Sequence, residues 1–285
     1  MAEERRTVIV TDSTCDLSDE QLEALGVRMI PLRITCQNAE YRDRVEISQD
    51  DIYAILEKEL PKTSLPLPED VSGLYDKLVA EGFTDAIHLS ISSGLSGTYN
   101  MVRMIAEDYR DRIHIHVVDS KTLSTGLGQI VLAAVDSLKN GDSPEAIVAK
   151  ALVVRHSQLS TFVIRTLEFL RKGGRIGLVE GMMGSILQIK PIIFVNDDGV
   201  YETLAKARGY KTAVETMVQE TVKKFGQAKV NLSVVHGRAL EDAQLLLEKL
   251  KNSLNVAECF IRPVSPVLAI HTGPGLLGVI ASKAE

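Results

Sequence analysis

The sequence predicts an α/β protein of two domains, the first with a mainly parallel sheet flanked by helices and the second with a mixed sheet. Three observations support this fold class. The chain has 285 residues, which is more than one hydrophobic core usually serves. Short β-rich runs alternate with helical patterns through the first half, as in parallel βαβ units. The second half instead contains an antiparallel hairpin, which indicates a mixed sheet.

The first half contains four β-rich runs that we expect to form the parallel sheet. These strands are predicted at residues 7–11, 28–34, 86–91 and 113–118. Helical periodicity and capping residues predict helices between and after them. The expected helices lie at residues 18–25, 99–110, 124–140 and 143–157.

The second half begins with a strong hairpin signal. Asp198 and Gly199 separate two β-rich runs at residues 190–195 and 200–204, and Asp-Gly favours the tight turn that a hairpin needs. Helices are expected at residues 210–225 and 240–253, with further strands at 231–235 and 269–271. We place the join near residues 157–162, which divides the chain into domains 1–160 and 161–285.

Charge and hydropathy limit the classes of partner. Lys and Arg number 32 against 38 Asp and Glu, for a net charge of -6, which argues against nucleic acid or an anionic membrane surface. The sequence has no apolar run of bilayer length and no signal-peptide core. We therefore expect a cytoplasmic protein without stable membrane insertion.

The cysteines and most histidines do not indicate a metal site. Cys15, Cys36 and Cys259 lack the paired spacing of zinc ligands, and we expect each to be a small, inert, buried side chain. His114 and His116 share one face of an expected strand, but no third metal ligand is apparent for them from the sequence, and a half-exposed strand face accounts for both. No bound metal is predicted.

Hydroxyl side chains are concentrated at the carboxyl ends of the expected strands, where open α/β sheets bind ligands. Helix capping accounts for most of residues 11–14 and 119–120. The loop at 90–98 has more hydroxyls than one cap needs, including Ser92 and Ser93 beside two glycines. Backbone N–H groups and hydroxyls in such a loop form an anion site, with a plain turn as the alternative.

Other motifs narrow the chemistry. The sequence lacks a Walker lysine motif, a dinucleotide fingerprint and a kinase glycine loop, so no nucleotide site is predicted. His271 is expected to end an apolar strand, next to a glycine-bearing loop. The basic residues at 171–175 and 206–208 are either solvated termini or a docking patch for a partner or phosphate.

Seven short motifs occur in order over essentially the whole chain, at residues 10–14, 41–43, 62–64, 92–99, 118–120, 166–177 and 271–275. Together they closely resemble the DegV family of bacterial fatty-acid-binding proteins. The resemblance implies a single long-chain fatty acid between two α/β domains. It also implies that a separate fatty acid kinase subunit uses ATP to convert the bound carboxylate to an acyl phosphate. The chain itself is then a carrier, not an enzyme, and needs no cofactor.

The resemblance also implies roles for individual residues. It places the carboxylate against Thr63 and Ser93, with His271 close by, and we include the neighbouring Ser64 and Ser92 as candidates. In relatives, the arginines that match Arg175 and Arg208 lie on the surface that meets the kinase. Two departures are noted: Arg165 replaces an acid that is common before the Thr-Leu-Glu motif, and Arg44 replaces a glycine.

The residues suggest a chemical reason for this arrangement. A bidentate arginine neutralises a carboxylate and lowers its nucleophilicity, whereas hydroxyls and a histidine orient it and leave an oxygen free to attack phosphate. Our hypothesis is therefore a carboxylate site without an arginine. Two alternatives are kept: a stand-alone phosphotransferase or hydrolase using Asp12 or His271, and a binding protein for another small acid or phosphorylated metabolite.

Overall fold

Four parallel strands form the N-terminal sheet in the computed structural model, which describes residues 5–182 and 188–284. Their order is β2-β1-β6-β7. The strands are β1 (Thr7–Asp12), β2 (Arg28–Ile30), β6 (Asp85–Ser90) and β7 (His114–Asp119). The predicted parallel sheet is confirmed.

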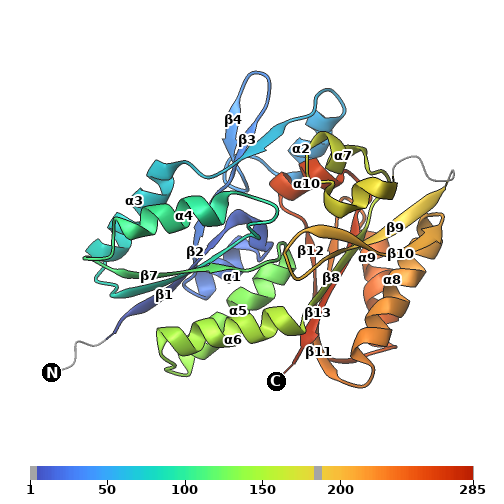
Figure 1. Cartoon of the computed structure of the whole chain (residues 1–285). Coiled ribbons are helices and arrows are strands. Elements are labelled where there is room, and N and C mark those ends of the chain that lie inside the picture. Colours follow the sequence, from blue (N-terminus) through green and yellow to red (C-terminus); the bar gives the residue numbers. More distant parts are fainter. Residues whose placement is uncertain (1–4, 183–187, 285) are drawn as a thin grey trace.

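Helices cover both faces of this sheet (Figure 1). Side chains alternate along β1, so Ile9 packs beneath one helix layer while Val8 and Val10 pack beneath the other. One layer contains α1 (Asp19–Ala24), α5 (Thr125–Lys139) and α6 (Pro144–Ser157). The other contains α3 (Pro68–Ala80) and α4 (Thr98–Glu107). The helices predicted at 18–25, 99–110, 124–140 and 143–157 are confirmed within a few residues.

The strand predicted at residues 28–34 is wrong in its second half. Pro31 has no N–H for a strand ladder, and the N–H of Leu32 donates to Ser13 Oγ at 3.1 Å. The chain therefore leaves the parallel sheet after Ile30 and enters a small antiparallel sheet of order β4-β3-β5. Its strands are β3 (Arg33–Thr35), β4 (Glu40–Arg42) and β5 (Lys62–Ser64), and α2 (Gln49–Leu56) lies between β4 and β5.

The part of the chain before β8 forms the N-terminal lobe, and the part from β8 onward forms a second lobe. The second lobe is built on a six-stranded mixed sheet of order β10-β9-β8-β13-β11-β12. Neighbours pair antiparallel except β11 and β12, which are parallel. The strands are β8 (Leu159–Val163), β9 (Ile189–Val195), β10 (Tyr201–Arg208), β11 (Lys229–His236), β12 (Asn255–Pro263) and β13 (Leu277–Lys283). The predicted hairpin is confirmed as β9–β10. The predicted boundary between residues 160 and 161 falls inside β8, all of which belongs to this sheet.

Helices α8 (Tyr210–Phe225) and α9 (Leu240–Lys251) cover one face of the mixed sheet, as Figure 1 shows, and both were predicted. The other face turns toward the N-terminal lobe and toward two short helices, α7 (Glu168–Lys172) and α10 (Pro266–Thr272). One hydrophobic cluster there joins both lobes, with Ile34 and Ile52 from the first and Phe162 and Ile270 from the second.

The strand predicted at 269–271 is wrong, because these residues lie in α10. Residues 266–272 are all buried, and an apolar run that is buried on every side has no periodicity to separate helix from strand. Two buried carboxylates of the N-terminal lobe satisfy N–H groups where α10 begins. Asp16 Oδ1 accepts from Ser265 N at 2.9 Å, and Asp43 Oδ1 accepts from Val267 N at 3.0 Å.

These two carboxylates make stability depend on pH. Burial raises the pKa of Asp16 to about 6 and the pKa of Asp43 to about 7. Both pKa values lie above the ordinary value of 3.8 for an aspartate. The folded state therefore binds more protons than the unfolded state between about pH 4 and about pH 7. The contribution of each carboxyl group to the free energy of unfolding therefore falls as the pH rises through that window.

We expect Asp43→Asn to remove the contribution of Asp43, since the amide stays neutral and keeps an oxygen for Val267 N. Relative to wild type, the variant should gain unfolding free energy between about pH 5 and about pH 8. Urea unfolding at both pH values measures this difference. Because His88 and His271 titrate equally in both proteins, a wild-type–variant difference that stays constant with pH would refute the assignment.

In the part of the chain that the structure describes, every helix is too short or too polar to cross a membrane.

Candidate functional site

Two adjoining cavities lie between the lobes. The first, which we call the polar cavity, has a volume of about 220 Å³. The second, which we call the apolar cavity, is smaller, with a volume of about 40 Å³. Leu123, Tyr201 and Leu268 line both, so the two cavities share a wall of three side chains.

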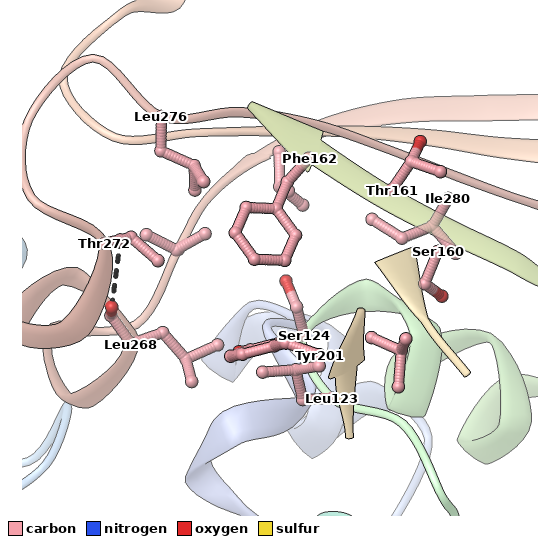
Figure 2. A pocket seen from close by; sticks show the side chains of 13 residues that line it. Leu123, Ser124, Ser160, Thr161, Phe162, Tyr201, Leu268, Thr272, Leu276 and Ile280 are labelled. Atoms are coloured by element: carbon pink, nitrogen blue, oxygen red, sulfur yellow. Dashed lines mark hydrogen bonds between the residues drawn. The ribbon is translucent and has the colours of Figure 1, made fainter. Parts of the chain in front are cut away.

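The apolar cavity lies between the mixed sheet, α10 and the start of α5 (Figure 2). Figure 2 shows the Phe162 ring pointing into it, and this ring meets Tyr201 edge to face at 5.0 Å between centroids. Its serine and threonine hydroxyls form hydrogen bonds within the protein. Ser160 donates to Gln158, Thr161 to Val279, Thr272 to Leu268 and Ser124 to Asp16. The surface offered to a ligand is therefore largely hydrocarbon.

The polar cavity brings together side chains from both lobes. Thr63 of β5 and His271 of α10 form a hydrogen bond of 2.8 Å between Oγ1 and Nε2. Ser64, Ser96 and Arg175 also line the cavity. Arg175 donates through Nη1 to Gly173 O at 2.7 Å and through Nε to Leu95 O at 3.4 Å. These two bonds fix the guanidinium at the cavity wall and leave further N–H groups for a ligand.

His271 is held in its neutral form. Burial and the positive charge of Arg175 lower the pKa of His271 to about 4. A neutral imidazole that donates from Nε2 to Thr63 Oγ1 leaves the hydroxyl hydrogen of Thr63 free to donate to a ligand oxygen. In that tautomer His271 positions Thr63, and the cavity offers the Thr63 hydroxyl and the Arg175 guanidinium to an anionic group.

The lack of a side chain at Gly173 makes room for the His271 ring. A Cβ on Gly173 would lie 2.2 Å from His271 Nδ1 and 3.0 Å from Phe169 O, although the backbone there is in an ordinary helical conformation. We expect Gly173→Ala to push α7 away from His271, break the Thr63–His271 bond and weaken ligand binding at least about tenfold.

Gly73→Ala is the matched control, since nothing lies within 4 Å of its Cβ and its backbone is helical. Binding titrations and thermal melts of both variants test this expectation. Equal ligand affinity in Gly173→Ala and Gly73→Ala would show that the close packing against His271 does not shape the site.

Ser92 and Ser93 lie off the described lining of the polar cavity. Ser92 Oγ donates to Gly199 O at 2.7 Å and accepts from Gly94 N at 3.1 Å. Ser93 Oγ accepts from Lys121 Nζ at 3.1 Å. Their predicted contact with a ligand stays a prediction. Ser96, from the same loop, is the hydroxyl that reaches the cavity.

The arginines lie in different surroundings. Half-buried Arg175 lines the polar cavity, whereas we expected it on a docking surface and expected no arginine at the carboxylate site; both expectations stay predictions. Arg208 is exposed at the end of β10. Arg165 stacks over the Tyr210 ring at 3.6 Å, and Arg44 adopts a left-handed conformation with φ 66° and donates to Asp19.

The cysteines take no part in either cavity. Burial raises the pKa of the Cys15 thiol to about 12, so that thiol is unreactive. The expectation that all three cysteines are buried is confirmed for Cys15 but not for Cys36, which is half-buried, and it is wrong for Cys259, which is exposed.

Comparison with known proteins gives a consistent result. The model of the DegV family, described as uncharacterised proteins, matches residues 6–284. A DegV domain-containing protein of Clostridium perfringens is 36% identical over 279 residues, covering 98% of this chain and 99% of the relative.

Solved structures agree in fold. A fatty-acid-binding DegV family protein of Thermus thermophilus has a TM-score of 0.91 and 34% identity, covering 98% of this chain and 100% of that one. DegV of Bacillus subtilis, a fatty acid binding protein, has a TM-score of 0.90 and 27% identity, with 99% and 100% coverage. A stearic acid-binding protein of Eubacterium ventriosum has a TM-score of 0.88 and 29% identity, with 96% and 97% coverage.

Proposed function

The chain belongs to the DegV family, and from this premise we propose that it binds one long-chain fatty acid across the two adjoining cavities. The observation that supports this most is the juxtaposition of the two cavities. A polar cavity with a cation and a hydroxyl donor shares Leu123, Tyr201 and Leu268 with an apolar one. Such a pair matches a molecule with an anionic end and a hydrocarbon tail.

The carboxylate fits the polar cavity because a buried charge needs partners. Arg175 supplies the opposite charge, and the hydroxyl of Thr63, oriented by His271, supplies a directed hydrogen bond. Ser64 and Ser96 lie on the same wall. Neutral His271 adds no second positive charge, so the net charge of the occupied site is close to zero.

The tail fits the apolar cavity because each buried methylene contributes about 0.8 kcal/mol. A chain of about fifteen methylenes gains about 12 kcal/mol before ordering costs. A volume of about 40 Å³ is too small for a whole tail, so binding requires Phe162, Leu268 and their neighbours to shift rotamers.

A finer proposal concerns what happens to the bound acid. We propose that the chain performs no complete reaction alone and presents the carboxylate to a separate fatty acid kinase. A carboxylate oxygen attacks the γ-phosphorus of the kinase's ATP, the bond to the β-phosphate oxygen breaks, and the products are acyl phosphate and ADP. Arg208 is exposed on β10 and suits a docking contact, and we propose that Arg175, which lines the polar cavity, contacts both the carboxylate and the incoming phosphate.

Titration of delipidated protein tests the binding proposal. We expect stoichiometric binding of palmitate, weaker binding of hexadecanol, which has no carboxylate, and no measurable binding of acetate or glycerol phosphate. Tighter binding of glycerol phosphate than of palmitate would favour the alternative of a phosphorylated metabolite. Turnover of ATP by the chain alone would favour the stand-alone phosphotransferase.

The kinase proposal has its own test, in which acyl phosphate is trapped as a hydroxamate. With a purified bacterial fatty acid kinase and ATP, we expect product from the palmitate-loaded chain. Arg208→Ala should lower the rate of transfer without changing palmitate affinity, whereas Lys224→Ala, an exposed cation on α8, should change neither. Equal rates for both variants would exclude Arg208 from docking.

A further inference from the structure

Three metal-ligating side chains meet at the amino ends of β6 and β7, at the opposite end of these strands from the polar cavity. Asp85 Oδ1 lies 3.8 Å from His114 Nδ1 and 3.6 Å from His116 Nε2. The three ligand atoms all lie within 4.8 Å of one another. The strand register explains this, because Asp85 pairs with His114 and Ile87 with His116, which places all three side chains on one face of the sheet. We propose that Asp85, His114 and His116 bind a divalent transition-metal ion.

The spacing suits a tetrahedral ion. Nitrogen and oxygen ligands lie at about 2.0 to 2.2 Å from Zn²⁺, so two of them at a tetrahedral angle are about 3.3 Å apart. The two measured separations are a few tenths of an ångström wider. His114 is exposed over about two thirds of its side chain (66%) and is free to make the small rotation that closes the site.

Hydrogen bonds within the protein do not explain why His116 is turned toward Asp85. His116 Nε2 is buried and has no hydrogen-bond partner among the described residues, and its 3.6 Å separation from the carboxylate is too long for a hydrogen bond. Burial and the neighbouring His114 lower the pKa of His116, which favours the neutral ring that binds metals. A metal ion between His116 and Asp85 satisfies both groups.

The surroundings support the same ligand set. Thr84 Oγ1 donates to Asp85 Oδ2 at 2.8 Å, so the carboxylate is oriented from behind while Oδ1 faces the two rings. Glu145, at the start of α6, acts electrostatically on His116 and pairs with Arg5 at 3.5 Å. Two imidazoles and one carboxylate favour Zn²⁺ or a similar ion over Mg²⁺ or Ca²⁺, and a water molecule can complete the tetrahedron.

This site is independent of fatty acid binding. Asp85 and Ser90 are the two ends of β6, and the five steps between them span about 17 Å. A metal ion here would link the amino ends of β6 and β7. Its loss would leave the polar cavity unchanged.

The test is a calorimetric titration of the full, untagged chain with Zn²⁺, followed by Co²⁺ spectroscopy for tetrahedral coordination. We expect one Zn²⁺ per chain in wild type. His116→Ala and His114→Ala should weaken binding about 100-fold or more, since even loss of a second-shell partner costs about 10- to 100-fold. Asp85→Asn should weaken it at least about tenfold.

His156→Ala is the matched control, because His156 is an exposed histidine on α6 outside the cluster, and it should bind like wild type. Far-UV circular dichroism checks folding, and exposed His114 keeps the test valid should Asp85→Asn fail to fold. Failure of wild type to bind Zn²⁺, or equal affinity in wild type, His114→Ala and His116→Ala, would overturn the proposal. Palmitate affinity should be the same in all these variants.

Discussion

Arg175→Ala is expected to weaken palmitate binding by about 10- to 100-fold. The guanidinium is the cation that lines the polar cavity, and a hydrogen bond to a charged group is worth about 1.5 to 3 kcal/mol. Without it the carboxylate keeps the Thr63 hydroxyl but no opposite charge in a site that is largely shielded from water. The affinity for hexadecanol should not change, because the alcohol has no charge to balance.

Two variants make this test specific. Arg171→Ala removes an exposed cation from the same short helix region and should bind palmitate like wild type. Arg175→Lys should recover part of the lost affinity, because a point charge is restored without the planar fork. If Arg175→Ala lowered palmitate and hexadecanol affinity equally, the arginine would act on packing and not on the carboxylate.

Leu268→Phe is expected to lower the affinity for palmitate about 100-fold while leaving octanoate nearly unaffected. Leu268 lies on the wall shared by the two cavities, so a ring there obstructs passage from one to the other. Each methylene that is kept out of the apolar cavity loses about 0.8 kcal/mol, and about four of them lose about 3 kcal/mol. A ladder of saturated acids of increasing length measures this directly.

The control separates obstruction from general strain. Leu250→Phe introduces the same ring at a fully buried leucine of α9, in the core between the mixed sheet and its helices. Both variants should lose about 1 to 3 kcal/mol of stability through overpacking, but only Leu268→Phe should change the chain-length profile. A uniform loss of affinity for all chain lengths would mean that the tail does not pass Leu268.

Regular elements were predictable where a short local pattern identifies them. The run of β-branched residues Val8, Ile9 and Val10 identifies β1, and Asp198-Gly199 identifies the β9–β10 hairpin. The failures have physical causes. Pro31 divided one expected strand between two sheets, and α10 has no exposed face from which a helical period can be read.

The site was less predictable than the fold, because it depends on tertiary contacts. Thr63 and His271 are separated by 208 residues, and the family resemblance, not the spacing, identified the pair. Arg175 was noticed as a basic residue, but nothing local shows that Gly173 O and Leu95 O turn its side chain toward the cavity. Asp85 was missed as a partner of His114 and His116 because only the β6–β7 register brings them together.

Native mass spectrometry of the purified chain tests the central proposal most directly. We predict a protein mass that exceeds the sequence mass by one long-chain fatty acid, with the excess lost on organic extraction and regained after incubation with palmitate. The same excess should be reduced in Arg175→Ala and retained in Arg171→Ala. A chain that shows no bound lipid, even after incubation with palmitate, would contradict the account.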